Sequence, residues 1–66
     1  MTPLDKEIIR GMADNDMSVL AVAKSLFMHR NTINYHIERV RRETGLNPRN
    51  FYDLAELLKR IEAENE

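Results

Sequence analysis

Hydrogen-bonding side chains gather in one short part of the chain, between residues 29 and 42. They are amide, hydroxyl, phenol, imidazole and guanidinium groups. Such groups suit recognition of DNA, because asparagine pairs with adenine, threonine offers a hydroxyl and a methyl to thymine, and arginine binds guanine or phosphate. No serine or threonine has a histidine–carboxylate setting for catalysis, and no glycine loop could hold a phosphate. We therefore expect DNA contacts, and neither enzyme activity nor a cofactor. The predicted contact residues are His29, Arg30, Asn31, Thr32, Asn34, Tyr35, Arg39 and Arg42.

Apolar residues in the same stretch recur with helical spacing. Ile33, Ile37, Val40 and Thr44 stand at i, i+4, i+7 and i+11, which at about 100° per residue places them on one side of a helix from about residue 30 to 44. Most of the hydrogen-bonding residues then lie on the other side. A face exposed only to solvent would more typically carry Glu, Lys and Ala. The pattern predicts a helix whose outer face contacts the major groove of DNA.

Charge is unevenly distributed along the chain. The net charge of −1 argues by itself against a nucleic-acid binder. Between residues 29 and 49, however, five arginines accompany two acids, a net +3, whereas the rest has five basic residues and nine acids, a net −4. Arginine binds phosphate and guanine through paired hydrogen bonds. This predicts one attractive face for a polyanion; the alternative is a basic helix surface that contacts only solvent.

A second, shorter helix is expected directly before this one. Ser18 is a suitable N-cap, and an apolar stripe follows at i, i+3, i+4 and i+7, ending at Leu26. Only residues 27–29 separate the two helices, and so short a connection forces a sharp crossing angle. That is the geometry of a helix-turn-helix, here about residues 18–44, in which the second helix presents its N-terminal half to a groove.

Two outer helices complete the prediction. Thr2 as N-cap, proline at the next position and Asp5 in a capping box begin a helix that ends near Ala13. In it, Gly11 either weakens the helix or lets another helix approach closely. Gly45 ends the third helix, with Leu46 folding back on its last turn. A fourth helix follows a cap formed by Asn50 and Asp53, and its predicted apolar face is Phe51, Leu54, Ala55, Leu58 and Ile61, widened by Tyr52 and Leu57.

Length and composition set the broad class. At 66 residues the chain has room for one domain, residues 1–66, which we expect to be an all-α, compact bundle of four helices. There is no cysteine for a disulfide or thiolate zinc site, and no apolar run of the roughly 20 residues that cross a bilayer. The N-terminus lacks the pattern of a signal peptide. We expect a soluble cytoplasmic protein with an acidic, frayed tail from residue 62 to 66.

The segment LFMHRNTINYHIERVRRETGL, residues 26–46, resembles the C-terminal helix-turn-helix of the PucR/CdaR-like bacterial transcription regulators. A looser resemblance extends over the flanking helices, and a weaker similarity runs to the Fis-type helix-turn-helix. Val40 stands where the family pattern has isoleucine. The residues that match the pattern are Leu26, Phe27, His29, Arg30, Asn31, Thr32, Ile33, Tyr35, Ile37, Thr44, Gly45 and Leu46.

The resemblance implies sequence-specific DNA binding in bacterial transcription regulation. It implies contacts from His29, Arg30, Thr32 and the next exposed turn. Family members commonly carry arginine where this chain has Asn34 and His36, so the predicted face is less positive here. The family module usually stands behind a sensory region, so we expect either a fragment or a short stand-alone relative.

Several alternatives stay open at this point. His29 is either a DNA contact or a turn residue that bonds locally, His36 is expected at the edge of the core, and the two are too far apart to share a metal ion. Arg42 could form only a helix ion pair with Glu38. The main rival to DNA binding is a small protein-interaction or dimerisation module that uses the fourth helix. A homodimer through the first or fourth helix is also expected, because regulators commonly bind DNA as dimers.

Overall fold

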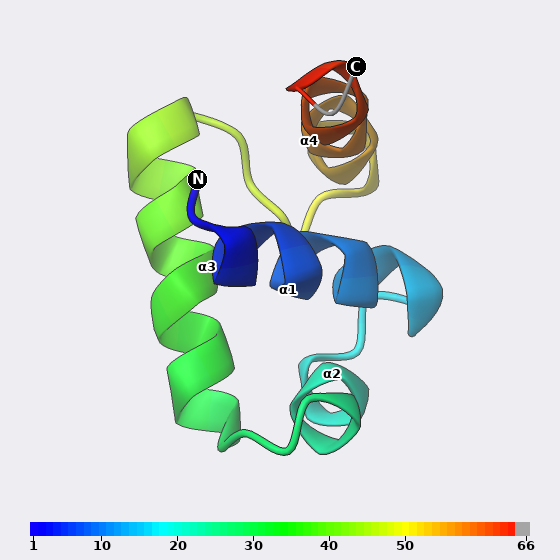
Figure 1. The fold of residues 1–66 in the computed structure, drawn as a ribbon, viewed down its shortest axis with the longest axis vertical. Coiled ribbons are helices and arrows are strands. Elements are labelled where there is room, and N and C mark those ends of the chain that lie inside the picture. The colour runs from blue at the N-terminus through cyan, green and yellow to red at the C-terminus, as the bar shows by residue number, and fades with distance from the viewer. Residues whose placement is uncertain (65–66) are drawn as a thin grey trace.

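Four α-helices account for most of the chain. The computed structural model describes residues 1–64, and over this range the chain forms α1 (Pro3–Asp14), α2 (Val19–Ser25), α3 (Arg30–Thr44) and α4 (Phe51–Glu64) (Figure 1). The described part contains no strand. The all-α prediction of four helices is therefore confirmed, and the helix boundaries agree closely with those expected from the caps.

Local hydrogen bonds explain where the first two helices begin. At α1, the Thr2 hydroxyl accepts the Asp5 N–H at 3.1 Å, and the Asp5 carboxylate accepts the Thr2 N–H at 2.9 Å. This reciprocal pair satisfies two groups that the first helical turn leaves without partners. At α2, the Ser18 hydroxyl accepts the Ala21 N–H at 3.2 Å. Both predicted caps are confirmed.

The third helix ends at a glycine in the left-handed region. Gly45 has φ of +76°, and its N–H donates to the Arg41 carbonyl at 2.9 Å. Leu46 then turns back and packs against the core, as expected. The fourth helix begins when the Asn50 side chain accepts the Asp53 N–H at 3.1 Å, which confirms the last predicted cap.

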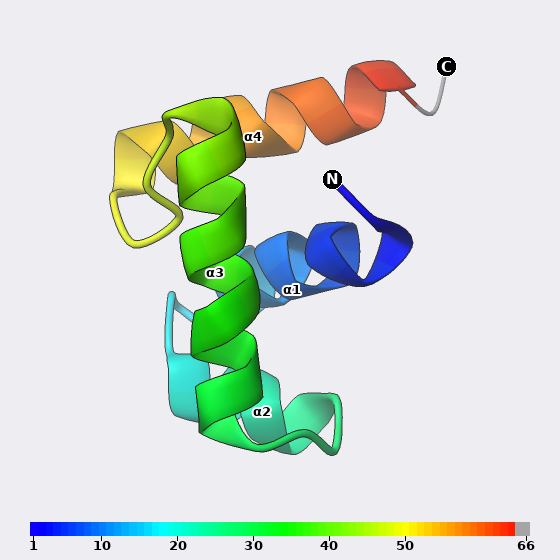
Figure 2. The ribbon, with the colours of Figure 1, turned by 90° about the vertical axis from the view of Figure 1, so that its left-hand side faces the viewer.

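The first helix is the centre of the arrangement. It lies close to each of the other three helices, and α3 lies close to α2 as well, whereas α4 lies close to α1 alone. In Figures 1 and 2, α3 stands upright beside α1, with α2 at one end of it and α4 near the other. The pair α2 and α3 and the fourth helix therefore share α1 as their common support.

A single apolar core lies where the helices meet. Gly11 allows the closest approach, because a Cβ placed there would lie 3.2 Å from the Val22 side chain. Of the two interpretations of Gly11, close helix approach is the one the packing supports. The buried apolar residues are Ile8, Ile9, Met12, Val22, Ala23, Ile33, Ile37, Val40, Leu54, Leu57 and Ile61.

Two details of the prediction were wrong, those of the α4 face and of the tail, and the place of Thr44 is refined. Leu57 is fully buried in α4, while Phe51 is 66% exposed and Ala55 is also exposed, so the core face is rotated from the one expected. Thr44 is only half-buried and uses its hydroxyl to bond the Val40 carbonyl at 2.7 Å. The predicted fraying from residue 62 is not seen up to Glu64, which is helical, and residues 65–66 lie outside the described range.

We predict that Gly45→Ala lowers the free energy of unfolding by about 1 kcal/mol, because alanine is strained at positive φ. The site has no neighbouring atom within 4 Å of a Cβ, so the loss reflects backbone strain alone. Gly45→Asn is the matched control, since asparagine tolerates this conformation and should lose less. Urea unfolding measures both; equal losses for the two variants would contradict the backbone explanation.

Candidate nucleic-acid interface

The connection between α2 and α3 reverses the chain within a few residues. The Met28 N–H donates back to the Ala23 carbonyl at 2.9 Å, which closes the end of α2. Phe27 adopts φ of +55° and its side chain is 96% exposed. His29 has an extended backbone and is the N-cap residue of α3. This turn places the N-terminus of α3 at an outer corner of the molecule (Figure 2).

His29 caps the third helix through its imidazole. The Nδ1 atom accepts the Asn31 N–H at 3.0 Å. A ring nitrogen that accepts cannot carry a proton, so the neutral ring holds its proton on Nε2. The side chain is exposed, which leaves Nε2–H as a free donor. The local bond is thus present, and it is compatible with an outward contact from the same ring.

The first two turns of α3 carry the exposed hydrogen-bonding groups. Arg30, Asn31 and Thr32 are exposed, and Tyr35 is 57% exposed. Arg42 extends this side two turns further along the helix. Within residues 1–64, no hydrogen bond or ion pair occupies the side chains of these five residues. Their donors and acceptors are available to a ligand.

Two other predicted contact residues are engaged within the protein. Arg39 turns toward α1, where its Nη2 donates to the Asp5 carboxylate at 2.7 Å. The carbonyl oxygen of Asn34 accepts a hydrogen bond from Arg49 Nη2 at 2.7 Å. The eight predicted contact residues therefore fall into six with outward groups and two that are held by side chains from other elements.

A buried carboxylate joins the N-terminus of α1 to the middle of α3. Asp5 has no exposed surface, and its Oδ1 atom meets both Arg39 and Nδ1 of His36, the latter at 2.9 Å. Burial raises the pKa of Asp5, but hydrogen bonds from the Thr2 N–H, His36 and Arg39 outweigh it and lower that pKa from 3.8 to about 2. The carboxylate is therefore charged at neutral pH. The side chain of His36 is 13% exposed, which confirms its expected place at the core edge.

This network reaches the exposed face through an aromatic ring. The Arg39 guanidinium lies over Tyr35, 5.8 Å from the ring centroid, and the His36 ring meets Tyr35 edge-on with centroids 5.5 Å apart. Cation–π and edge-to-face contacts restrict the ring's orientation. The tyrosine hydroxyl is thereby presented from a positioned ring at the boundary between the network and the outer face.

Arg49, from the α3–α4 connection, is a site residue that sequence reasoning missed. Its Nη1 donates to the Glu38 carboxylate at 2.8 Å while Nη2 bonds Asn34. This bond, with the charge of nearby Arg41, lowers the pKa of Glu38. Arg42 is not the ion-pair partner of Glu38 that the sequence suggested; Arg49 and Arg41 are. The contacts span 11 and 15 residues, so no local spacing could have found them.

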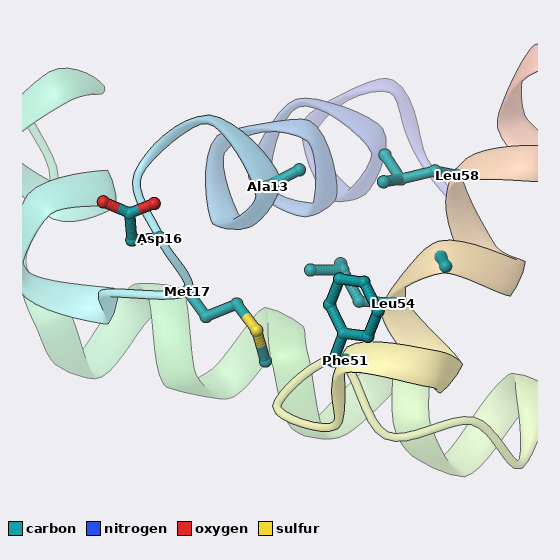
Figure 3. A pocket seen from close by; sticks show the side chains of 7 residues that line it. Ala13, Asp16, Met17, Phe51, Leu54 and Leu58 are labelled. Carbon is teal, nitrogen blue, oxygen red and sulfur yellow. The ribbon is translucent and has the colours of Figure 1, made fainter.

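A separate apolar groove lies away from these polar residues. It encloses about 330 Å³ between the end of α1, the α1–α2 turn and the start of α4 (Figure 3). Phe51 stands at its rim, and Tyr52 beside it is 80% exposed. The lining residues are Ala13, Asp16, Met17, Phe51, Leu54, Ala55 and Leu58, none of which belongs to the predicted contact set.

Other kinds of site were sought in the same residues. Over residues 1–64, no group of three or more His, Cys, Asp or Glu side chains could hold a metal ion. None of the described helices is long and apolar enough to cross a membrane.

Comparison with known proteins identifies one family. The family model of the PucR C-terminal helix-turn-helix domain matches residues 6–63, which covers α2, α3 and most of α1 and α4. No curated protein and no solved structure matches the chain. The match covers the helix-turn-helix turn, the exposed first turns of α3 and the supporting helix α1.

We predict that acid weakens the fold through Asp5. Because the pKa of Asp5 is about 2 in the folded chain and 3.8 ordinarily, its stabilisation is complete above about pH 4 and is mostly lost as the pH falls to 2. The loss should be about 2 kcal/mol in the free energy of unfolding. Asp5→Asn should produce a similar loss already at pH 7 and remove the change between pH 4 and 2.

Urea unfolding at pH 2, 3, 4 and 7 measures this dependence. Glu7→Gln is the matched control, since it removes an exposed carboxylate from the same helix. It should leave the wild-type profile between pH 4 and 2 in place. A profile for Asp5→Asn that still falls over this window would contradict the assignment to Asp5.

Proposed function

Since the chain belongs to the PucR C-terminal helix-turn-helix family, a DNA-binding regulatory family, we propose that it binds DNA sequence-specifically with α3 in the major groove. The observation that carries this proposal is the free polar face on the first two turns of α3. Arg30, Asn31, Thr32 and Tyr35 offer donors and acceptors there without protein partners in the described residues. In a helix-turn-helix, this part of the second helix meets the base edges.

The contacts divide by chemistry. Asn31 and Thr32 have the short, neutral side chains that read base edges. Arg30 and Arg42 are exposed cations, and His29 has a free Nε2–H; these groups suit phosphate contacts, which set orientation and affinity. Tyr35 supplies a hydroxyl for the backbone from a ring held by Arg39. Arg39 itself acts through this ring and its bond to Asp5.

The local charge supports the same orientation despite the acidic total. Two acids on α3 or beneath it, Glu38 and Asp5, are each paired with arginine, at 2.8 Å and 2.7 Å. Pairing reduces their repulsion of phosphate. Arg30, Arg41 and Arg42 are exposed on the same helix, where they outnumber its one other acid, the exposed Glu43. The surface that we propose to face the major groove of DNA is therefore more positive than the net charge of −1 suggests.

We predict that the chain binds random duplex DNA at 50 mM salt and much more weakly at 200 mM, because phosphate contacts release counterions. Arg30→Ala should reduce affinity and lower the salt slope by about one, the value for one lost phosphate contact. Lys59→Ala is the matched control, since it removes an exposed cation from α4. Fluorescence anisotropy measures both.

Two results would contradict the proposal. One is an absence of binding at concentrations up to about 100 μM, where ordinary non-specific binding is detectable. The other is an equal effect of Arg30→Ala and Lys59→Ala on affinity and salt slope, which would mean that α3 is no closer to the DNA than α4.

We also propose that a second copy of the chain occupies the apolar groove when two copies bind neighbouring half-sites. A stable protein interface buries about 800 Å² per partner, roughly a fifth of the 4358 Å² exposed here. The groove with Phe51 and Tyr52 forms only part of such an area. Pairing is then weak in free solution and is stabilised on DNA, which holds both copies at high effective concentration.

We predict that Ala55→Glu abolishes cooperative binding to a duplex with two half-sites and leaves the affinity for a single half-site nearly unchanged. Ala55 is exposed and lines the groove, so a glutamate there blocks the partner without disturbing the core. Ala63→Glu is the matched control, because it adds the same charge to α4 outside the groove. Equal cooperativity in the two variants, measured by titration of both duplexes, would count against this role of the groove. It would then favour a different protein partner.

A further inference from the structure

The α3–α4 connection is built to deliver one arginine to the side of α3. The Asn47 side chain accepts the Arg49 N–H at 3.0 Å, and the Asn47 N–H donates to the Asp53 carboxylate in the first turn of α4 at 2.9 Å. Pro48, between them, is buried. Each neighbour of Arg49 is therefore tied to the structure, and the backbone of Arg49 has a defined position.

The guanidinium of Arg49 binds two side chains one helical turn apart. Asn34 and Glu38 are at i and i+4 of α3, so they lie on the same side of it. Arg49 donates from Nη2 to Asn34 at 2.7 Å and from Nη1 to Glu38 at 2.8 Å. A guanidinium has only donors, so the Asn34 atom that it meets must be the carbonyl oxygen. Hydrogen bonds from a charged donor are about twice as strong as neutral ones.

This contact changes what Asn34 can offer to a base. A free asparagine pairs with adenine because it both accepts from N6 and donates to N7. Arg49 occupies one of the two lone pairs of the Asn34 oxygen and fixes the orientation of the amide, so a base that needs this acceptor must compete with a charged donor. The NH2 group of Asn34 has no partner among the described residues. The half-exposed guanidinium beside it presents only donors. Guanine is the base whose major-groove edge has two acceptors, N7 and O6.

We propose that Arg49 is a specificity-determining residue that holds the oxygen of Asn34, leaves its NH2 group as the available one, and thereby selects guanine over adenine at one position of the operator. This inference rests on the proposed function, because it requires α3 in the major groove. It adds the α3–α4 connection to the recognition surface. Glu38, one turn further along α3, is held by the same guanidinium. This ion pair disfavours a hydrogen bond from the cytosine amino group to the Glu38 carboxylate, and it reduces the repulsion between that carboxylate and phosphate.

The test is selection of duplexes from a randomised pool by the wild-type chain and by Arg49→Ala, followed by affinity measurements on guanine and adenine versions of the selected site. The wild type should prefer guanine at one position. Arg49→Ala should shift that position to adenine, with a change in the guanine-to-adenine affinity ratio on the order of tenfold, the discrimination of one bidentate pair. Adding Asn34→Ala to Arg49→Ala should remove the preference for adenine.

Arg41→Ala is the matched control, since it removes an exposed arginine near Glu38 without touching Asn34. It should lower affinity and keep guanine at the position. An unchanged base preference in Arg49→Ala would overturn the inference while leaving the proposed function intact. A shift of equal size in Arg41→Ala would overturn it too, because charge alone would then explain the effect. If the wild type enriches no sequence, sequence-specific binding fails first, and the inference falls with it.

Discussion

The arrangement of the helices depends on the buried carboxylate of Asp5. One of its oxygens accepts the Thr2 N–H and so completes the cap of α1, while the other meets His36 and Arg39 of α3. A buried charge without partners would be costly, so these bonds must all form together. The capping box holds the side chain in one orientation at the start of α1. The beginning of α1 is thereby coupled to the rotation of α3 about its own axis.

This coupling separates α3 into held and free groups. On one flank, Arg39 is bound by Asp5, and on the other, Asn34 and Glu38 are bound by Arg49. The groups between these flanks, on the first turns, have no such partners within residues 1–64. Binding costs less when the presenting helix is already fixed, because little freedom is lost on association. A helix in a fixed position, with unpaired polar side chains on its first turns, is suited to the contact with the DNA major groove that we propose.

The fourth helix stands apart from this arrangement. It lies close to α1 alone, and among the described residues neither its exposed aromatic side chains nor those that line the apolar groove belong to the network around Asp5. Its buried residues share the apolar core with those of α3, but the outer side of α4 takes no part in that core. Among the described residues, the polar side chains that connect α4 to the outer side of α3 belong to the α3–α4 connection, where Asp53 supports Asn47 and thus Arg49. The association that we propose through α4 and the recognition that we propose for α3 use different residues.

The sequence by itself determined most of what depends on near neighbours, although the Glu38–Arg42 ion pair that it suggested is not the one formed. The capping box at Thr2, the left-handed Gly45 and the apolar spacing of α3 were predictable, because each involves residues within one or two turns of each other. What only the tertiary structure decided is which polar groups on α3 are free. Arg39 pairs with a residue 34 positions away and Asn34 with one 15 positions away.

The same limit explains the error in α4. Leu57 is buried and Phe51 exposed because α1 alone covers that helix, and the direction of approach selects one part of a wide apolar face. Periodicity shows that such a face exists, but it contains no information about the side from which another helix arrives. Local bonds are determined by spacing along the chain, whereas the choice among equally apolar or equally polar neighbours is made by packing in three dimensions.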